Sequence, residues 1–129
     1  MDGYVAKIAY ASRELNARER IKLKDTSNAI SLDDLTLKQG NVVIAVDMFA
    51  KLEIHNEKSE NKDYLVFIIV DTSGNKYMTS SPSFISTFED IDDEMNDAFD
   101  GTREPYEIEV YRKESKNYKG KEFITCSIC

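Results

Sequence analysis

The chain has few of the side chains that bind metals or carry out redox chemistry. Its only histidine is His55, and its only cysteines are Cys126 and Cys129, which form one C-x-x-C motif. A zinc site needs a second pair of ligands, and a redox C-x-x-C begins a helix, for which no residue follows Cys129. We therefore expect no metal ion, no cofactor and no redox function, and we interpret Cys126 as a buried strand residue.

Long apolar runs are absent as well. No stretch approaches the roughly 18 consecutive apolar residues that a membrane span needs, and no apolar signal-peptide segment follows Met1. The 129 residues are 41% hydrophobic and 32% charged, which is typical of one globular domain with a buried core. We expect a single domain over residues 1–129, located in the cytoplasm.

Positive charge is absent from residues 82–100, although this stretch carries seven acidic side chains. That number equals the whole formal net charge of −7, so the rest of the chain is neutral in sum. Ser81 suits a helix N-cap, and Pro82 suits the first helical position. The apolar residues of the stretch follow one another at helical spacing: Phe84, Phe88, Ile91, Met95 and Phe99. We expect an amphipathic helix with one face in the core and an acidic face in solvent.

The first forty residues give less regular signals. Residues 18–24 alternate basic side chains with Ile21 and Leu23, which predicts a half-buried strand whose outer face is basic. Residues 1–16 fit either a short helix or an added strand, and we treat them as an N-terminal extension. Residues 25–41 are expected to form a long loop with at most one turn of helix.

The remaining strand patterns lie on both sides of the acidic helix. Residues 42–54 alternate over a length at which we expect a strand to bend, as strands do in small barrels. Further strands are expected at residues 64–70, 75–79, 106–111 and 122–128. If residues 18–24 form the first strand and 75–79 a hairpin extension, five main strands enclose one helix between the third and fourth. This is the order of the OB-fold, a five-stranded Greek-key barrel, so the predicted class is mainly β.

An OB-fold binds oligonucleotides on its second and third strands and with the loops between strands one and two and strands four and five. In this chain those places carry basic and aromatic side chains. Cations follow the phosphates of single-stranded DNA, and rings stack on its bases with little regard to sequence. The candidate binding residues are Arg20, Lys22, Lys24, Phe49, Lys51, Tyr64, Tyr77, Tyr111, Arg112, Lys113, Lys116, Tyr118, Lys119, Lys121 and Phe123. Ordinary structural roles remain open for them, since Tyr64 fits the core and a lysine-rich loop can simply be solvated.

Three short motifs in the second half of the chain carry a family resemblance. They are Asp71, Gly74 and Tyr77 in a hairpin; Phe84 or Phe88 with Asp90 and Ile91 in the helix; and Ser115, Lys116, Lys119, Gly120 and Phe123 before the last strand. With these motifs the chain resembles the small single-stranded DNA-binding proteins of tailed phages and mobile elements of Gram-positive bacteria, including the type used in protein-primed replication. The resemblance covers roughly the last sixty residues. It implies an OB-like fold and cooperative, non-specific and non-catalytic coating of single-stranded DNA during replication, in the cytoplasm of the bacterial host.

Two other functions are weighed against this one. The acidic helix face can instead recruit a protein, either a replication protein or a host protein on which a phage factor acts. An enzyme is the second alternative, because Asp90, Asp93, Glu94 and Asp97 lie at helical spacing. We reject the enzyme because these carboxylates have no basic or histidine partner nearby and no nucleophile–base pair occurs elsewhere. The sequence leaves open whether the protein is a monomer or a small homo-oligomer.

Overall fold

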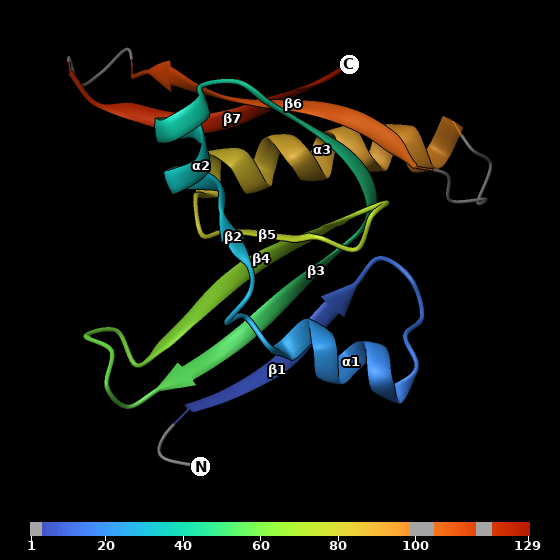
Figure 1. Ribbon diagram of the computed structural model, residues 1–129, viewed down its shortest axis with the longest axis vertical. Coiled ribbons are helices and arrows are strands. Elements are labelled where there is room, and N and C mark those ends of the chain that lie inside the picture. The colour runs from blue at the N-terminus through green and yellow to red at the C-terminus, as the bar shows by residue number, and fades with distance from the viewer. Residues whose placement is uncertain (1–3, 99–104, 116–119) are drawn as a thin grey trace.

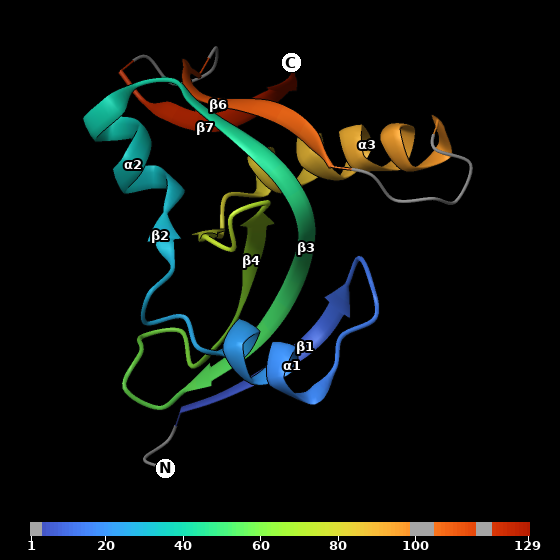
Figure 2. The same cartoon turned by 45° about the vertical axis from the view of Figure 1, so that its right-hand side comes forward.

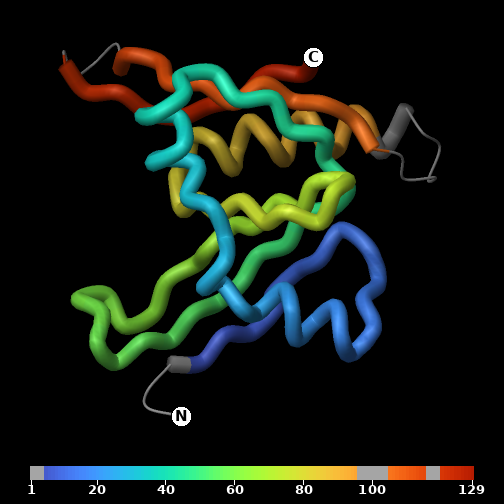
Figure 3. The backbone as a smooth tube through the Cα atoms, viewed as in Figure 1, coloured from blue at the N-terminus to red at the C-terminus, as the bar shows by residue number. Residues whose placement is uncertain are grey.

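The computed structural model describes the backbone of residues 4–98, 105–115 and 120–129 and the side chains of residues 5–95, 105–115 and 120–129. One curled sheet dominates the molecule, with helices on both of its faces (Figures 1 and 3). The elements in chain order are β1 (Tyr4–Ala11), α1 (Ala17–Lys24), β2 (Ile30–Ser31), α2 (Leu32–Gln39), β3 (Val42–Asn56), β4 (Asp63–Asp71), β5 (Lys76–Thr79), α3 (Pro82–Ala98), β6 (Tyr106–Glu114) and β7 (Glu122–Ile128). Among the described residues, no helix is long and apolar enough to cross a membrane.

Strand β3 is the long strand around which the sheet is built. Along one edge it pairs with β4, while along the other it pairs first with β6, from Val42 to Val46, and then with β1, from Ala50 to Asn56. A register shift between Val46 and Met48 marks a bulge, and the strand curves as expected for a bulged strand (Figure 2). The prediction of a long, bent strand is confirmed.

The mainly β, OB-like class is also confirmed, although the strands are assigned differently. The hydrogen-bonded order is β2–β5–β4–β3–β6–β7, and this sheet curls into a half-barrel with α3 between β5 and β6 in the chain. The five OB-type strands are therefore β3, β4, β5, β6 and β7. The series begins at Val42 rather than at Arg18, and β5 is a full member rather than an extension.

The predicted strand at residues 18–24 is wrong, because these residues form helix α1. Its N-terminus is closed by a capping box: Asn16 Oδ1 accepts a hydrogen bond from the Glu19 amide at 2.9 Å, and the Glu19 carboxylate accepts one from the Asn16 amide at 3.1 Å. Leu23 is buried and Ile21 is 70% exposed, so the two apolar side chains do not share a face. The capping box and the burial of Leu23 both stabilise a helix, so these residues are helical although basic and apolar side chains alternate along them.

Two more N-terminal segments are more regular than the sequence indicates. Residues 4–11 form β1, which adds to β3, so the strand alternative for the extension is the correct one. Within residues 25–41, the expected long loop contains helix α2, with the Ser31 hydroxyl as its N-cap acceptor. Strand β2 precedes this helix and pairs with β5 in parallel.

The sheet separates two apolar cores. Phe67 and Ile69 of β4 point toward α3, where they meet Phe84 and Phe88. Alternate residues of the same strand point the other way, and there Ile68 joins the second core. That core comprises Leu23, Met48, Ala50, Leu52, Ile54 and Ile68. Helices α3 and α1 therefore cover opposite faces of the sheet.

Helix α3 is present as predicted from Pro82 to Ala98. Phe84 and Phe88 are fully buried, and Ile91 and Met95 pack against the same core as half-buried side chains. The predicted end of the helix at residues 99–101 lies outside the described residues. One acidic side chain does not follow the prediction, since Asp92 is buried and accepts a 2.7 Å hydrogen bond from the Tyr106 hydroxyl.

Candidate nucleic-acid interface

Three of the predicted binding residues lie together on the outer face of the β6–β7 hairpin. In β6, Ile108 and Val110 are buried against the core. Alternation along the strand therefore places Tyr111 and Lys113 on the opposite face. Lys113 pairs directly with Phe123 of β7 in the sheet register, so the ammonium group and the second ring share that face. We call Tyr111, Lys113 and Phe123 the hairpin face.

The hairpin face combines two aromatic rings, of which Tyr111 is oriented by a hydrogen bond, with the ammonium group of Lys113. The Tyr111 hydroxyl and Ser127 Oγ are 2.9 Å apart in a hydrogen bond that fixes the ring against β7. Tyr111 and Phe123 are half-buried, so part of each ring reaches solvent. Lys113 is exposed and forms no ion pair within the described part of the chain. Its ammonium group is therefore available to a phosphate.

The sheet separates the hairpin face from the acidic helix. Helix α3 packs on the inner side of β7, where the Ser83 hydroxyl donates to the Ile124 carbonyl oxygen at 3.3 Å. Figure 1 shows α3 on one side of β6 and β7. The hairpin face lies on the other side, because its residues alternate with those that are buried in the core under α3. A polyanion on the hairpin face is therefore kept away from the exposed carboxylates of α3, although Glu109, next to Tyr111 on the same face of β6, places a carboxylate on its own side.

The loop that joins β6 and β7 is only partly described. Lys121 is exposed at the end of the hairpin, where the Ser115 amide donates to its carbonyl oxygen at 2.8 Å. Lys116, Tyr118 and Lys119 lie outside the described residues, so their predicted role stays a prediction.

Arg112 does not share the hairpin face. It lies one residue from Tyr111 and Lys113 and so points to the inner side of the sheet. There its Nη1 donates to the Asp33 carbonyl oxygen and to Thr36 Oγ1 of α2, each at 3.4 Å, and its Nε donates to Glu122 at 3.3 Å. Its guanidinium group holds α2 against the sheet. We expected residues 112–121 to form a loop between the last two strands, but β6 continues to Glu114 and so includes Arg112.

Phe49 was predicted as a binding residue on the non-core face of its strand, and this prediction is wrong. Its side chain is 4% exposed and packs between Phe67, at a ring-centroid distance of 5.3 Å, and Phe88, at 5.2 Å. The bulge between Val46 and Met48 is the cause, because it shifts the alternation by one residue and turns Phe49 inward. We therefore remove Phe49 from the binding residues.

The predicted basic row of Arg20, Lys22 and Lys24 does not exist as one row. These residues lie on helix α1, where every second position is turned by about 200°, so Lys22 projects away from Arg20 and Lys24, which lie one turn apart on the same side. Arg20 donates to the Leu15 carbonyl oxygen at 2.6 Å. We do not assign the α1 residues to the DNA interface.

The other candidates have structural partners. Lys51 forms a 2.8 Å ion pair with Glu89 of α3. Tyr64 is half-buried against the second core, as its structural alternative allowed. The Tyr77 hydroxyl donates to Asp71 Oδ2 at 3.2 Å, and burial raises the pKa of Tyr77. None of these three belongs to the hairpin face.

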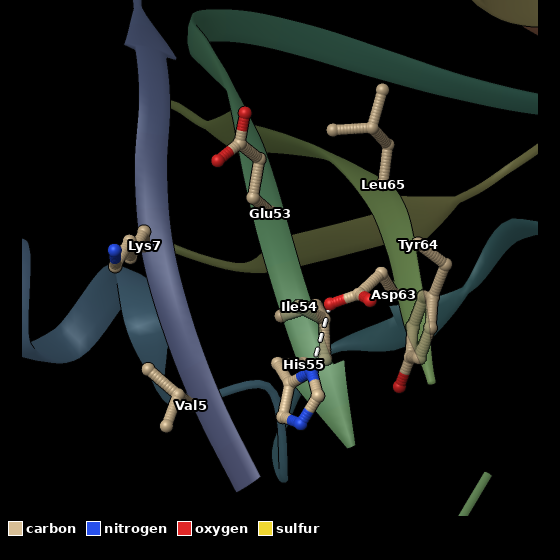
Figure 4. Close-up of a pocket in the computed structure, with 8 residues that line it drawn as sticks. All are labelled: Val5, Lys7, Glu53, Ile54, His55, Asp63, Tyr64 and Leu65. Carbon is tan, nitrogen blue, oxygen red and sulfur yellow. Dashed lines mark hydrogen bonds and ion pairs between the residues drawn. The ribbon is translucent and has the colours of Figure 1, made fainter. Parts of the chain in front are cut away.

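A shallow depression on β1, β3 and β4, of about 450 Å³, is a poorer place for a polyanion (Figure 4). At its edge, His55 Nδ1 lies 2.7 Å from Asp63 Oδ1, and Nε2 lies 2.7 Å from Glu57 Oε1. The hydrogen bonds to Asp63 and then Glu57 raise the pKa of His55. Glu53 adds a further carboxylate to the lining, so acidic groups outnumber the one lysine, Lys7.

Sequence reasoning missed Ser127, which orients the Tyr111 ring. The alternation of residues 122–128 contained the signal, since it places Ser127 on the face of Phe123 and opposite to Cys126. Among the described residues, no three metal-binding side chains gather into a group that could hold an ion.

Comparison with known protein families identifies a family for this chain. A family model described as phage single-stranded DNA-binding protein matches residues 5–129, which is nearly the whole chain. No curated protein and no solved structure matches the chain.

Proposed function

The chain belongs to the family of phage single-stranded DNA-binding proteins, and from this premise we propose that it holds the DNA strand on the hairpin face. The family binds single-stranded DNA in phage replication and is typically non-enzymatic. We propose that this member is likewise without catalytic activity and acts in the cytoplasm of the bacterial host. The family gives no support to the alternative of a host-directed interaction module.

One observation carries the choice of surface. Lys113 and Phe123 are directly paired on the same face as Tyr111, on the side of the sheet that α3 does not cover. Rings that stack on bases beside a cation for the phosphates are what sequence-tolerant single-strand binding requires. We include Lys121 and the predicted loop residues Lys116, Tyr118 and Lys119 as an extension of this surface.

The test measures separately what the Lys113 ammonium group and the Phe123 ring contribute to DNA binding. Binding of labelled oligo-dT is measured by fluorescence anisotropy at several salt concentrations for Lys113→Ala and Phe123→Leu. Lys113→Ala should weaken binding and lower the slope of log K against log salt by about 0.7, because one phosphate contact is lost. Phe123→Leu should weaken binding roughly 5- to 150-fold, the equivalent of ~1–3 kcal/mol for one stacked base, and leave the slope unchanged.

Matched controls come from surfaces away from the hairpin face. Lys38→Ala removes an exposed lysine from α2, and Tyr10→Leu removes a ring that is 50% exposed on β1. Both controls should bind as the wild type does. Wild-type affinity and salt slope in a folded Lys113→Ala/Phe123→Leu double variant would place the DNA on another surface and overturn the proposal.

A further inference from the structure

Helix α1 presents an exposed apolar side chain among basic ones. Ile21 is 70% exposed and points away from the buried Leu23. Arg18 and Lys24 lie three residues before and after Ile21, so they flank it on the same face of the helix. Arg18, Lys22 and Lys24 form no ion pair with any residue that the structure describes.

Helix α3 presents the complementary combination. An open groove of about 880 Å³ lies between this helix and β4, and its apolar lining includes Leu65, which is 54% exposed, and the half-buried Ile85. The acidic side chains Glu89, Asp90 and Asp93 line the same groove. Glu89 is paired with Lys51, whereas Asp90 and Asp93 are exposed and have no ion-pair partner within the described ranges.

These two surfaces cannot meet within one molecule. Helix α1 packs on the second core and α3 on the first, so the sheet lies between them. Figures 1 and 2 both place α1 beside β1 and α3 beside β6 and β7, at opposite ends of the molecule. A second copy of the chain offers the partner that each surface lacks.

We propose that copies of this protein associate head to tail, with α1 of one copy seated in the α3 groove of the next. Ile21 then packs against Leu65 and Ile85, while Arg18 and Lys24 face the unpaired Asp90 and Asp93. DNA bound by α1 would neutralise only the basic surface and leave the acidic groove without a cation, whereas a second copy matches both. A contact between two different surfaces leaves one free surface of each kind at the two ends, so it extends into an open row of copies unless the rotation between neighbours closes a ring.

The proposed contact between copies is separate from the contact with DNA, and it does not depend on which face of the protein binds the DNA strand. One short helix in one groove makes a small interface, which we expect to be weak between free molecules. Neighbouring copies on one DNA strand are held at a high effective concentration, so the same contact becomes effective there. The contact would thus join proteins along a strand that each of them binds separately.

Charge reversal with complementation tests the proposal. The first full-length variant carries Arg18→Glu and Lys24→Glu, and the second carries Asp90→Lys and Asp93→Lys. Each alone brings like charges together and should bind long poly-dT on the order of tenfold more weakly than the wild type. Each should bind an oligo-dT that accommodates one copy with unchanged affinity. An equimolar mixture should recover binding to long poly-dT, because the reversed helix then meets the reversed groove.

An uncharged pair of variants provides the matched control. Ile21→Ser removes the proposed apolar contact, whereas Leu37→Ser removes a similarly exposed side chain, 65% exposed, from α2. Only Ile21→Ser should lose affinity for long poly-dT, and circular dichroism should show that both fold.

Two results would overturn the row of copies. The first is wild-type binding of long poly-dT by both reversed variants, or no recovery in their mixture. The second is a loss of short-oligo binding in the α1 variant alone, which would assign α1 to DNA instead. Failure of the hairpin face as the DNA site is a separate outcome, because it is measured with Lys113→Ala and Phe123→Leu on the short oligo-dT.

Discussion

Phe88→Ala should destabilise the protein more than most single substitutions. The side chain is fully buried at the contact between α3 and the sheet. Its ring lies within aromatic packing distance of Phe49 at 5.2 Å, Phe67 at 5.3 Å, Phe84 at 6.0 Å and Tyr106 at 6.5 Å. Truncating a buried phenylalanine costs about 3–5 kcal/mol, and aromatic pairs add about 0.5–1.5 kcal/mol each. We therefore expect a loss near the upper end, about 4–5 kcal/mol.

Urea unfolding under reducing conditions, followed by circular dichroism, measures this loss. A domain has about 5–15 kcal/mol of stability in total, so the variant should be close to unfolded or have a strongly lowered midpoint. With an m-value of about 2 kcal/mol per molar urea, the midpoint should fall by about 2 M. Leu37→Ala, at a side chain 65% exposed, is the control and should stay within about 0.5 kcal/mol of the wild type. A loss below about 1 kcal/mol for Phe88→Ala would refute the packing of α3 into the core.

Two further predictions concern titratable groups. Because Asp63 and Glu57 raise the pKa of His55, an NMR titration should give a value above 6.5, and Asp63→Asn should lower it. The folded pKa exceeds the unfolded one, so this stabilisation is complete below about pH 6.5 and is lost as pH rises through the folded pKa; an unshifted titration would refute the contacts. Burial raises the pKa of Cys126 to about 12, so a thiol reagent at pH 8 should modify Cys129 in the folded protein and both cysteines only in denaturant. Rapid labelling of Cys126 in the folded protein would contradict its burial.

The sequence predicted correctly those helices and strands whose apolar residues recur at one clear helical or strand spacing. The apolar stripe from Phe84 to Met95 and the proline at position 82 predicted α3 correctly. Length alone indicated that β3 must bend. Alternation in residues 122–128 correctly places Ile124 and Cys126 in the core, whereas Ile128, which the same alternation places there, is 47% exposed. Where these predictions hold, the period of the side chains and the tertiary environment agree.

The wrong predictions concern residues whose structure is set by a cap, a bulge or a tertiary contact and not by the spacing of apolar residues. A capping box at Asn16 and Glu19 makes a helix of residues that alternate like a strand. The bulge before Met48 turns Phe49 into the core, and no single-residue pattern marks where a bulge falls. The inward direction of Arg112 follows from its register with Ile124, and its use as a clamp on α2 depends on a helix that the sequence did not predict.

The shared strand β3 has a consequence for how the molecule comes apart. Its first half supports the core under α3 and its second half supports the core under α1, and one continuous backbone passes through both. Loosening either core therefore frays a strand on which the other core also depends. The two halves should melt together as one cooperative unit, although each has its own helix and its own apolar centre.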